Sequence, residues 1–560
     1  MTDSTLFLTG NTADAPRSDL PGLLGALAAD LRAVDYTLDG VAGLLGESAY
    51  SALGRDQIIP ALLATESAAR GEGTAAALAA VVRLWLLAEP QTQATLDAAL
   101  PGIRAGGLVE LGLLEPVPGA DPSGAGLFQA KADLRPYGWE GAGGEDTVSS
   151  GGAELWVASD LAAHQQAGVL RHDHVLGIGQ ASTTLVQTTI RRHVARALDL
   201  GTGCGIQSFH LLHHAEHVTA TDISERALAF TRFNLLLNAE ALHLDPGNLE
   251  QRVSLRLGSL LEPVAAEEFD LVVSNPPFVI TPRTLGEEAS GQFTYRDGGL
   301  PGDEIVSSLV RDLPSVLAPG GTAQLLGNWE IPAGTEWHHR PQSWASPDAD
   351  AWFIQREQVS PEQYAETWLQ DASESRDRQH YRDAYAAYLA DFASRNVAGI
   401  GFGMIWLRKP ADGAAGTGAA RISRFEEITY PIEQPVGPHL GAAVERSDWL
   451  AAHSLEDAHL LVADDVTEER HQRPGAEHPG VILLRQGAGL RRTNLLSTEL
   501  AGFVSACDGD LSVGQIIGAL AALLGGSLAG EDGFDGDAFR AALLTEVGNL
   551  VRDGFLLPAS

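Results

Sequence analysis

Short β-branched runs and longer helical windows alternate between Val194 and Trp329. This alternation is typical of βαβ units, whose strands form a mostly parallel sheet that helices cover on both faces. We therefore expect an α/β fold in the middle of the chain. The predicted strands are residues 197–200, 218–223, 253–257, 271–274 and 323–326.

The first 115 residues have a different pattern, in which Ala- and Leu-rich windows are separated by glycines. Apolar residues recur at spacings of three and four, for example at Leu78, Val81, Val82 and Trp85, as in helices with one buried face. We predict a helical N-terminal domain over residues 1–115. The pattern of residues 103–114 fits the last helix and wing of a winged-helix module, and it fits a plain helical bundle as well.

Residues 116–152 are rich in Gly, Pro, Asp and Ser and are expected to form a linker or an arm. The α/β domain is predicted over residues 153–436, with an insert at about 331–396. In its last part, residues 397–407 and 422–432 are predicted strands that could form the hairpin closing the sheet. Residues 437–560 are predicted to be a separate C-terminal domain, whose end again has a winged-helix-like pattern.

The charge of the chain is strongly negative along its whole length. The sequence has 73 Asp and Glu against 37 Lys and Arg, a formal net charge of −36. Duplex nucleic acid is usually bound through neutralisation of phosphates, so this balance argues against nucleic acid as the sole partner. A local basic group, Arg191, Arg192, His193 and Arg196, could contact RNA, and a solvated helix face explains it equally well.

Cysteine usage and segment hydropathy exclude several classes of protein. Cys204 and Cys507 are too few for a disulfide framework or a structural zinc site. The N-terminus has neither the basic region nor the apolar stretch of a signal peptide. Polar residues and glycines interrupt the long uncharged stretch 511–530, so we expect no membrane segment and a cytoplasmic protein.

A glycine-rich sequence after the first predicted strand is the strongest indication of a ligand site. Asp199-Leu-Gly-Thr-Gly-Cys-Gly places Gly201, Gly203 and Gly205 at alternate positions between a strand and a helix. Glycine there lets the backbone approach a ligand closely and adopt unusual φ/ψ. The spacing differs from the G-x-G-x-x-G of dinucleotide sites. The carboxylate of Asp199 suits a ligand with an ammonium group better than a pyrophosphate.

A second carboxylate, Asp222, ends the next predicted strand. Such a group can accept hydrogen bonds from both hydroxyls of a ribose. An acidic residue at a strand end is by itself more often a helix N-cap. Together with the glycine loop, it indicates a nucleoside with a cationic end, and we predict S-adenosyl-L-methionine.

The predicted strand 271–274 runs into Asn275, Pro276, Pro277 and Phe278. The side-chain oxygen of Asn275 and the carbonyl of Pro276 can each accept one N–H of a target NH2 group, which orients the nitrogen lone pair toward a sulfonium methyl. The prolines fix the turn, and Phe278 offers a face on which a planar amide or base can stack. The alternative is a Pro-Pro turn that only closes the strand.

These motifs, with Gly258-Ser259, resemble the class I S-adenosylmethionine-dependent methyltransferases of the Asn-Pro-Pro-Tyr/Phe type, the methyltransferase small domain. Tyr295-Arg-Asp-Gly-Gly-Leu-Pro-Gly-Asp-Glu304 and Leu317-Ala-Pro-Gly-Gly-Thr322 are similar to the HemK-type protein glutamine N5-methyltransferases. The ribosomal RNA guanine N2-methyltransferases have similar sequences and more often carry Phe in the fourth motif position. The resemblance covers roughly residues 170–330. It implies a Rossmann-like seven-stranded class I core. The residue patterns at the two ends of the chain predict mainly helical domains on either side of this core in the sequence.

The resemblance also implies roles for individual residues. Asp199 and the glycines would hold the methionine part of the cofactor, Asp222 the ribose, and Ser259 or Leu260 the adenine edge. Many relatives have Asp where Ser259 stands, so the adenine contact would come from the backbone. The catalytic set is Asn275, Pro276, Pro277 and Phe278. The full cofactor-binding set is Asp199, Gly201, Thr202, Gly203, Cys204, Gly205, Asp222, Ile223, Ser259, Leu260 and Asn275.

Two further groups of residues have competing interpretations. His210, His213, His214 and His217 could present a metal site. Their helix must pack beside the glycine loop, so we predict no metal. Trp337-His-His-Arg340 in the insert could line a substrate cleft or form a plain loop.

These inferences predict an enzyme, an S-adenosylmethionine-dependent N-methyltransferase that acts on an amide or exocyclic amino nitrogen of a macromolecule. Protein glutamine, for example in a translation factor, is the first expected substrate. Guanine N2 or adenine N6 in RNA or DNA is the second. A scaffold that binds the cofactor without catalysis is a third reading, and the sequence carries no signal for an oligomeric state.

Overall fold

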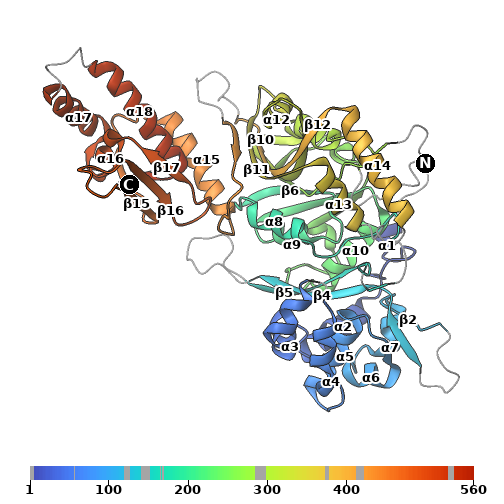
Figure 1. The fold of residues 1–560 in the computed structure, drawn as a ribbon. Helices are drawn as coiled ribbons and strands as arrows, with labels where there is room; N and C mark the ends of the chain where they lie inside the picture. Colours follow the sequence, from blue (N-terminus) through green and yellow to red (C-terminus); the bar gives the residue numbers. More distant parts are fainter. Residues whose placement is uncertain are drawn as a thin grey trace. The chain divides into compact units, whose positions relative to one another are not determined.

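The computed structural model describes residues 6–55, 57–118, 126–139, 152–163, 165–166, 170–283, 298–371, 378–411, 422–527 and 535–559. It divides into two compact units, one of residues 1–186 and 192–410 and one of residues 187–191 and 411–560 (Figure 1). The second unit therefore begins before residue 437, where the sequence suggested a boundary. It includes strand β13 (Ser423–Glu427).

Seven strands of the first unit stand in one sheet, in the order β8-β7-β6-β9-β10-β12-β11. Strands β6 to β10 are parallel, and β12 runs antiparallel to both β10 and β11. This mixed α/β sheet confirms the predicted Rossmann-like core. The strands are β6 (Val194–Leu200), β7 (Ala215–Asp222), β8 (Val253–Leu257), β9 (Phe269–Ser274), β10 (Leu317–Pro332), β11 (Asp350–Val359) and β12 (Val397–Arg408).

The strand order reverses between β6 and β9. The chain moves from β6 outward to β7 and β8 and then returns to place β9 on the other side of β6. Ligands of open α/β sheets bind outside the carboxyl ends of the strands at such a switch point. The connecting helices are α9 (Ile206–Leu211), α10 (Glu225–Leu237) and α11 (Glu304–Asp312), and α8 (Gln180–Thr188) precedes β6.

The predicted closing hairpin of residues 397–407 and 422–432 is wrong. Strand β12 pairs with β10 on one side and with β11 on the other, and β11 lies inside the predicted insert. The continuous apolar run Ala351–Ile354 is buried on both faces, so it lacks the alternation that marks a half-exposed strand. The rest of the insert contains α12 (His339–Trp344), α13 (Pro361–Asp371) and α14 (Arg378–Ser394).

The N-terminal part is helical, as predicted, and ends in a small sheet of order β1-β3-β2. The elements α5, β1, α6, α7, β2 and β3 follow one another along the chain in this part. The elements are α1 (Leu6–Thr9), α2 (Pro21–Ala33), α3 (Leu38–Leu53), α4 (Ile59–Ala69), α5 (Thr74–Trp85), β1 (Gln91–Thr92), α6 (Gln93–Ala99), α7 (Arg104–Glu110), β2 (Leu114–Pro116) and β3 (Leu127–Ala130).

The range expected to be a linker contains β3 and also β4 (Asp133–Trp139), which pairs antiparallel with β5 (Ala153–Ser159). Two buried asparagines of α10 bind the backbone of β5. Asn234 accepts from Ala158 N at 2.7 Å and donates to Ala158 O at 2.9 Å. Asn238 makes the same pair of bonds to Trp156, at 2.9 and 2.7 Å. The β4-β5 ribbon is therefore attached to the helix that follows β7.

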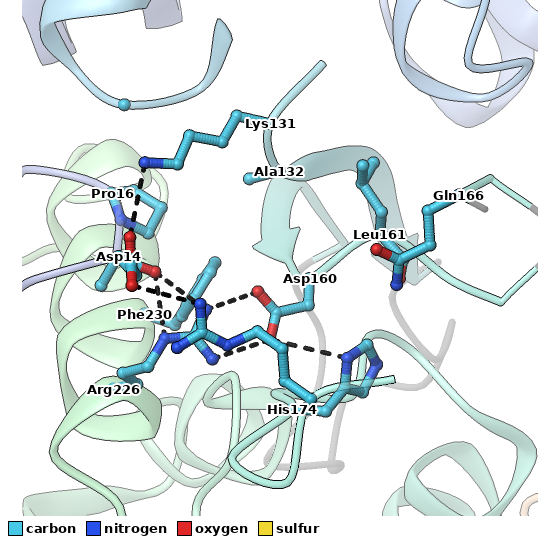
Figure 2. A pocket seen from close by; sticks show the side chains of 13 residues that line it. Asp14, Pro16, Lys131, Ala132, Asp160, Leu161, Gln166, His174, Arg226 and Phe230 are labelled. Atoms are coloured by element: carbon cyan, nitrogen blue, oxygen red, sulfur yellow. Dashed lines mark hydrogen bonds and ion pairs between the residues drawn. The ribbon is translucent and has the colours of Figure 1, made fainter. Parts of the chain in front are cut away.

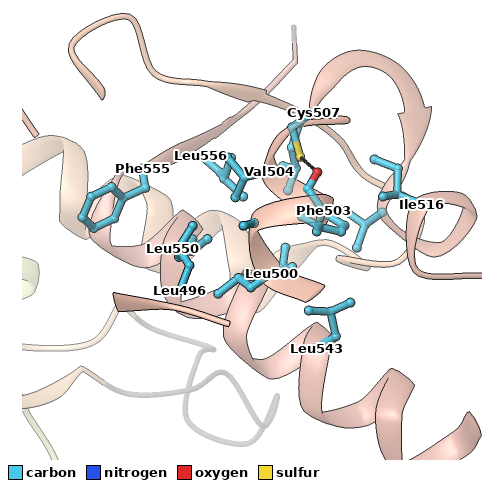
Figure 3. Packing of buried hydrophobic residues seen from close by; sticks show 14 of the residues in the cluster. Leu496, Leu500, Phe503, Val504, Cys507, Ile516, Leu543, Leu550, Phe555 and Leu556 are labelled. Carbon is cyan, nitrogen blue, oxygen red and sulfur yellow. Dashed lines mark hydrogen bonds between the residues drawn. The ribbon is translucent and has the colours of Figure 1, made fainter. Parts of the chain in front are cut away.

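The second unit has two three-stranded sheets, β18-β14-β19 and β15-β16-β17, in addition to its helices. Its core gathers Phe503, Leu550 and Phe555 (Figure 3), and the thiol of Cys507 lies 3.4 Å from the carbonyl of Phe503. None of the helices in the described parts of the chain is long and apolar enough to cross a membrane. The elements are α15 (Gly437–Ala452), β14 (His459–Val462), β15 (Val466–His471), β16 (Val481–Gln486), β17 (Thr493–Leu496), α16 (Thr498–Val504), β18 (Asp508–Ser512), α17 (Val513–Ser527), α18 (Gly536–Asp553) and β19 (Leu556–Pro558).

Candidate active site

The glycine loop joins β6 to α9 at the switch point of the sheet. Gly201, Gly203 and Gly205 have φ values of 78°, 59° and 96°, a region that other residues rarely adopt. A Cβ atom at Gly201 or Gly203 would meet nothing within 4 Å, whereas one at Gly205 would lie 3.2 Å from the side chain of Thr231. The loop therefore packs on α10 at its end and faces open space at its first two glycines.

Asp199 lies beneath this loop and is 1% exposed. Its Oδ2 accepts hydrogen bonds from Thr202 Oγ1 at 2.8 Å, Ser208 Oγ at 2.7 Å and Ser208 N at 3.0 Å. Its Oδ1 is buried and has no partner. Burial raises the pKa of Asp199 to about 6, although these hydrogen bonds oppose the shift. A buried carboxylate oxygen without a hydrogen-bond partner favours the binding of a cationic group.

Asp222 at the end of β7 holds the loop from the other side. Its carboxylate accepts from Gly203 N at 3.0 Å and from Ser224 N at 2.8 Å, and burial raises its pKa. Each oxygen of a carboxylate has a second lone pair, so hydroxyl donors can still bind. The next residue, Ile223, is 59% exposed and offers an apolar surface beside the carboxylate.

The remaining cofactor candidates lie on the glycine loop and at the carboxyl end of β8. Ser259 is exposed at the carboxyl end of β8, where Gly258 N donates to the carbonyl of Asp222 at 3.0 Å. Leu260 has a positive φ of 48°. Cys204 is buried, and burial raises the pKa of its thiol to about 12, which suits a packing residue and not a nucleophile.

Asn275 and the glycine loop are neighbours because Leu200 and Ser274 are register partners at the ends of β6 and β9. Ser274 Oγ also donates to the carbonyl of Leu200 at 2.8 Å. The side-chain Oδ1 of Asn275 is buried without a partner. The carbonyl of Pro276 accepts from Phe278 N at 2.8 Å and keeps one lone pair for another donor. Pro277 and Phe278 are partly exposed in the same turn.

The donor set fits S-adenosylmethionine. The open space before Gly201 and Gly203 can take the methionine part, and the unpaired Asp199 oxygen can accept from its ammonium group. Asp222 can accept from the ribose, and Ile223 can pack on the adenine. These assignments rest on the empty space and the unpaired oxygen, which the sequence could not reveal.

Other candidate residues lie elsewhere. Arg192 donates to the carbonyls of Asp270 and Gly320, and Arg196 pairs with Glu267. Because Arg196 lies near the start of β6, this basic group belongs to the edge of the sheet opposite the glycine loop.

The histidines after the glycine loop have separate protein partners. His210 Nε2 lies 2.7 Å from the hydroxyl of Tyr137, His214 Nδ1 lies 3.0 Å from the carbonyl of Arg192, and His217 Nε2 lies 2.9 Å from Ser254 Oγ. In the insert, Trp337 stacks on Trp329 and Arg340 pairs with the buried Asp303. Of the stretch 295–304, residues 295–297 lie outside the described residues.

A separate polar cavity of about 190 Å³ lies near the start of α10 (Figure 2). Its central guanidinium, Arg226, pairs with Asp160 at 2.6 Å and donates to the carbonyl of Asp14 at 2.8 Å. Arg171 and Lys131 also pair with Asp14, at 3.2 and 3.8 Å. The cations and carboxylates of this cavity thus bind one another and attach the N-terminal segment to α10.

Residues 275–280 are here called the acceptor loop. Two buried polar residues lie near it that the sequence did not mark, Asn328 on β10 and Tyr364 on α13. Asn328 Nδ2 donates to the hydroxyl oxygen of Tyr364 at 3.0 Å, and Ile280 N donates to the same oxygen at 2.8 Å. Nothing in the local pattern marks these residues, because their contacts join segments far apart in the chain.

Residues 160–288 match the family model described as the methyltransferase small domain, and residues 33–123 match a domain of unknown function, DUF7059. A ribosomal protein uL3 glutamine methyltransferase of Bradyrhizobium diazoefficiens is 32% identical over 28% of this chain and 46% of its own length. A release factor glutamine methyltransferase of Geobacter sulfurreducens is 28% identical over 30% and 56%. A ribosomal RNA small subunit methyltransferase C of Alcanivorax borkumensis is 26% identical over 34% and 49%.

This chain thus spans about half the length of these relatives. The family match over residues 160–288 includes the glycine loop, Asp222 and Asn275. Residues 160–288 are therefore a methyltransferase small domain, which belongs with the class I S-adenosylmethionine-dependent methyltransferases.

Proposed function

We propose that this chain is an enzyme that transfers the methyl group of S-adenosylmethionine to a side-chain amide nitrogen of a protein, with glutamine as the acceptor. The observation that carries the proposal is the unpaired, buried Oδ1 of Asn275 directly beside the glycine loop. A buried amide oxygen without a partner costs about 1–3 kcal/mol. An acceptor NH2 group would remove that cost in the bound complex.

The residues of the chain bind and orient, and the cofactor supplies an electrophilic methyl group on a sulfonium sulfur. Asn275 Oδ1 and the Pro276 carbonyl each accept one N–H of the acceptor, so the nitrogen lone pair points away from them. A new N–C bond forms as the C–S bond breaks, and the extra proton on nitrogen then leaves to water. Positioning supplies most of the acceleration, so no general base is needed.

Protein glutamine is favoured over a nucleobase by charge. The net charge of −36 disfavours phosphate binding, and Arg192 and Arg196 lie at the edge of the sheet opposite the site. Two of the relatives named above modify ribosomal protein uL3 or a release factor by name, which supports a protein of the translation apparatus in the cytoplasm. A base of ribosomal RNA is the second candidate, which the RNA methyltransferase relative and Phe278 support.

The test uses purified full-length protein, methyl-tritiated S-adenosylmethionine and an extract of cells that lack this chain. The wild type should label a species that protease destroys and nuclease leaves, and mass spectrometry should find a methylated glutamine. Asn275→Ala should keep its affinity for S-adenosylhomocysteine and lose transfer by about 100-fold or more. Label that survives protease but not nuclease would overturn the glutamine assignment. Cofactor binding without any transfer by the wild type would instead support a scaffold.

A further inference from the structure

The backbone after the acceptor motif is held by a side chain of the insert. Ile280, two residues after Phe278, is fully buried, and its N–H donates to the hydroxyl oxygen of Tyr364 at 2.8 Å. Tyr364 is 1% exposed on α13. Its ring stacks on Phe402 with centroids 5.7 Å apart and meets Phe392 edge-on at 5.5 Å. The hydroxyl is therefore fixed in place by packing on β12 and α14.

The same hydroxyl oxygen also holds Asn328 of β10, whose Nδ2 donates to it at 3.0 Å. Asn328 is fully buried, and its Oδ1 has no partner. Two hydrogen bonds through one phenol oxygen thus connect the acceptor loop to Asn328.

The register of the sheet places Asn328 near Asn275. Ser274 and Leu325 are partners at the ends of the paired parts of β9 and β10. Asn275 follows Ser274 directly, and Asn328 is three residues after Leu325 on β10, which continues past the end of its pairing with β9 and still pairs with β12, where Asn328 is the partner of Phe402. Both end in a buried, unpaired amide oxygen. Most buried polar atoms in native proteins are paired, so two unpaired amide oxygens, one directly after β9 and one on the neighbouring strand β10, indicate a bound group with several N–H donors.

We propose that Asn328 is a second acceptor-binding residue, whose side-chain oxygen accepts a hydrogen bond from a peptide N–H of the segment that carries the methylated amide. Tyr364 is the positioning residue that holds Asn328 and the acceptor loop together. This inference rests on the proposed function. It gives the insert a role in substrate binding, since α13 supplies Tyr364.

The test compares Tyr364→Phe and Asn328→Leu with the wild type. Tyr385→Phe is the control, because it removes a hydroxyl of the neighbouring helix α14 that contacts the side chain of Glu366 at 3.2 Å. All three variants should bind S-adenosylhomocysteine within about twofold of the wild type in calorimetry, since none touches the cofactor site. Tyr364→Phe should speed hydrogen exchange at the amide of Ile280, and Tyr385→Phe should not.

Transfer is measured with the extract of cells that lack this chain. At saturating extract, Tyr364→Phe should lower the rate by about 100-fold, as expected for a misplaced acceptor. Asn328→Leu should raise the half-saturating extract concentration by about tenfold, the worth of one hydrogen bond. Tyr385→Phe should match the wild type.

Each result decides a different statement. If the wild type is active and both Tyr364→Phe and Asn328→Leu transfer methyl groups as fast as Tyr385→Phe, this inference is overturned. The proposed function is unaffected by that result. Faster exchange at Ile280 without a lower rate would overturn the positioning role of Tyr364. An inactive wild type that transfers to no extract component would overturn the proposed function and this inference with it.

Discussion

Asp199 is the residue whose chemistry depends most on its surroundings. It is an ordinary acidic residue in the sequence, yet burial raises its pKa to about 6 and leaves one oxygen unpaired. Between pH 4 and 6, the folded protein therefore holds a proton on this carboxyl group. The unfolded chain, with a carboxyl pKa near 3.8, has released it in that range. The unliganded protein therefore gains stability from this group as the pH falls through 6 toward 4.

Cofactor affinity should depend on pH in the opposite sense. An ammonium group binds the ionised carboxylate, so affinity for S-adenosylhomocysteine should be full above pH 7 and fall by up to about tenfold per pH unit below 6. Calorimetry at several pH values, with two buffers of different ionisation enthalpy, should show proton release on binding near pH 6. Asp199→Asn should bind weakly and lack this dependence. An affinity that stays constant from pH 5 to 7 would contradict the role of Asp199.

Replacing Gly203 by alanine tests whether the cofactor occupies the open space in front of the glycine loop. Gly203→Ala strains a position with φ of 59° by about 1–2 kcal/mol and places a methyl group where the cofactor is proposed to lie. Gly334→Ala is the matched control, because Gly334 has φ of 77° and also no atom near a Cβ. Both variants should lose similar stability in urea unfolding, and only Gly203→Ala should lose affinity for S-adenosylhomocysteine. Equal affinities of the two variants for S-adenosylhomocysteine would show that the cofactor does not occupy this space.

At the scale of elements, α10 connects the β4-β5 ribbon to the glycine loop. Asn234 binds Ala158 on β5 and also donates to the carbonyl of Cys204 in the loop at 2.9 Å. Asn238, one turn later, binds Trp156 and the carbonyl of Asn234 but no atom of the loop. The two residues therefore share one structural role and differ in their contact with the loop.

This difference gives a prediction for the helix. Asn234→Leu and Asn238→Leu should each lower the free energy of unfolding by about 2–4 kcal/mol, because each leaves buried backbone groups of β5 unpaired. Only Asn234→Leu should also weaken binding of S-adenosylhomocysteine, since it releases the carbonyl of Cys204. Urea unfolding and calorimetry measure the two effects. If both variants bound S-adenosylhomocysteine with equal affinity, α10 would not support the glycine loop through Asn234.

At the scale of the whole molecule, each compact unit contains one buried cysteine. Cys204 lies in the first unit and Cys507 in the second, and burial raises the pKa of each thiol to about 12. Both should resist thiol reagents in the native protein. With rising urea, each should become reactive when its own unit opens.

S-adenosylhomocysteine at 100 times its Kd should protect Cys204 by about 2.7 kcal/mol in the free energy of opening. It should leave the urea midpoint for Cys507 unchanged, since the proposed site lies in the first unit. Pulsed labelling followed by mass spectrometry of the two cysteine peptides measures both. A common midpoint that shifts for both cysteines would show that the two units unfold together.

The candidate site could be predicted from the sequence because its motifs are runs of neighbouring residues. The alternating strands and helices, the glycines at 201, 203 and 205, and the turn at Asn275 are local patterns, and local backbone sterics and hydrogen-bonding capacity give them their meaning. The tertiary structure alone decided what depends on distant partners. It placed β11 next to β12, buried Asp199 and thereby raised its pKa, paired Asn234 with β5, and brought Tyr364 of the insert to Ile280 and Asn328. Burial and pairing are properties of the folded chain, since they arise only when segments far apart in sequence exclude water from one another.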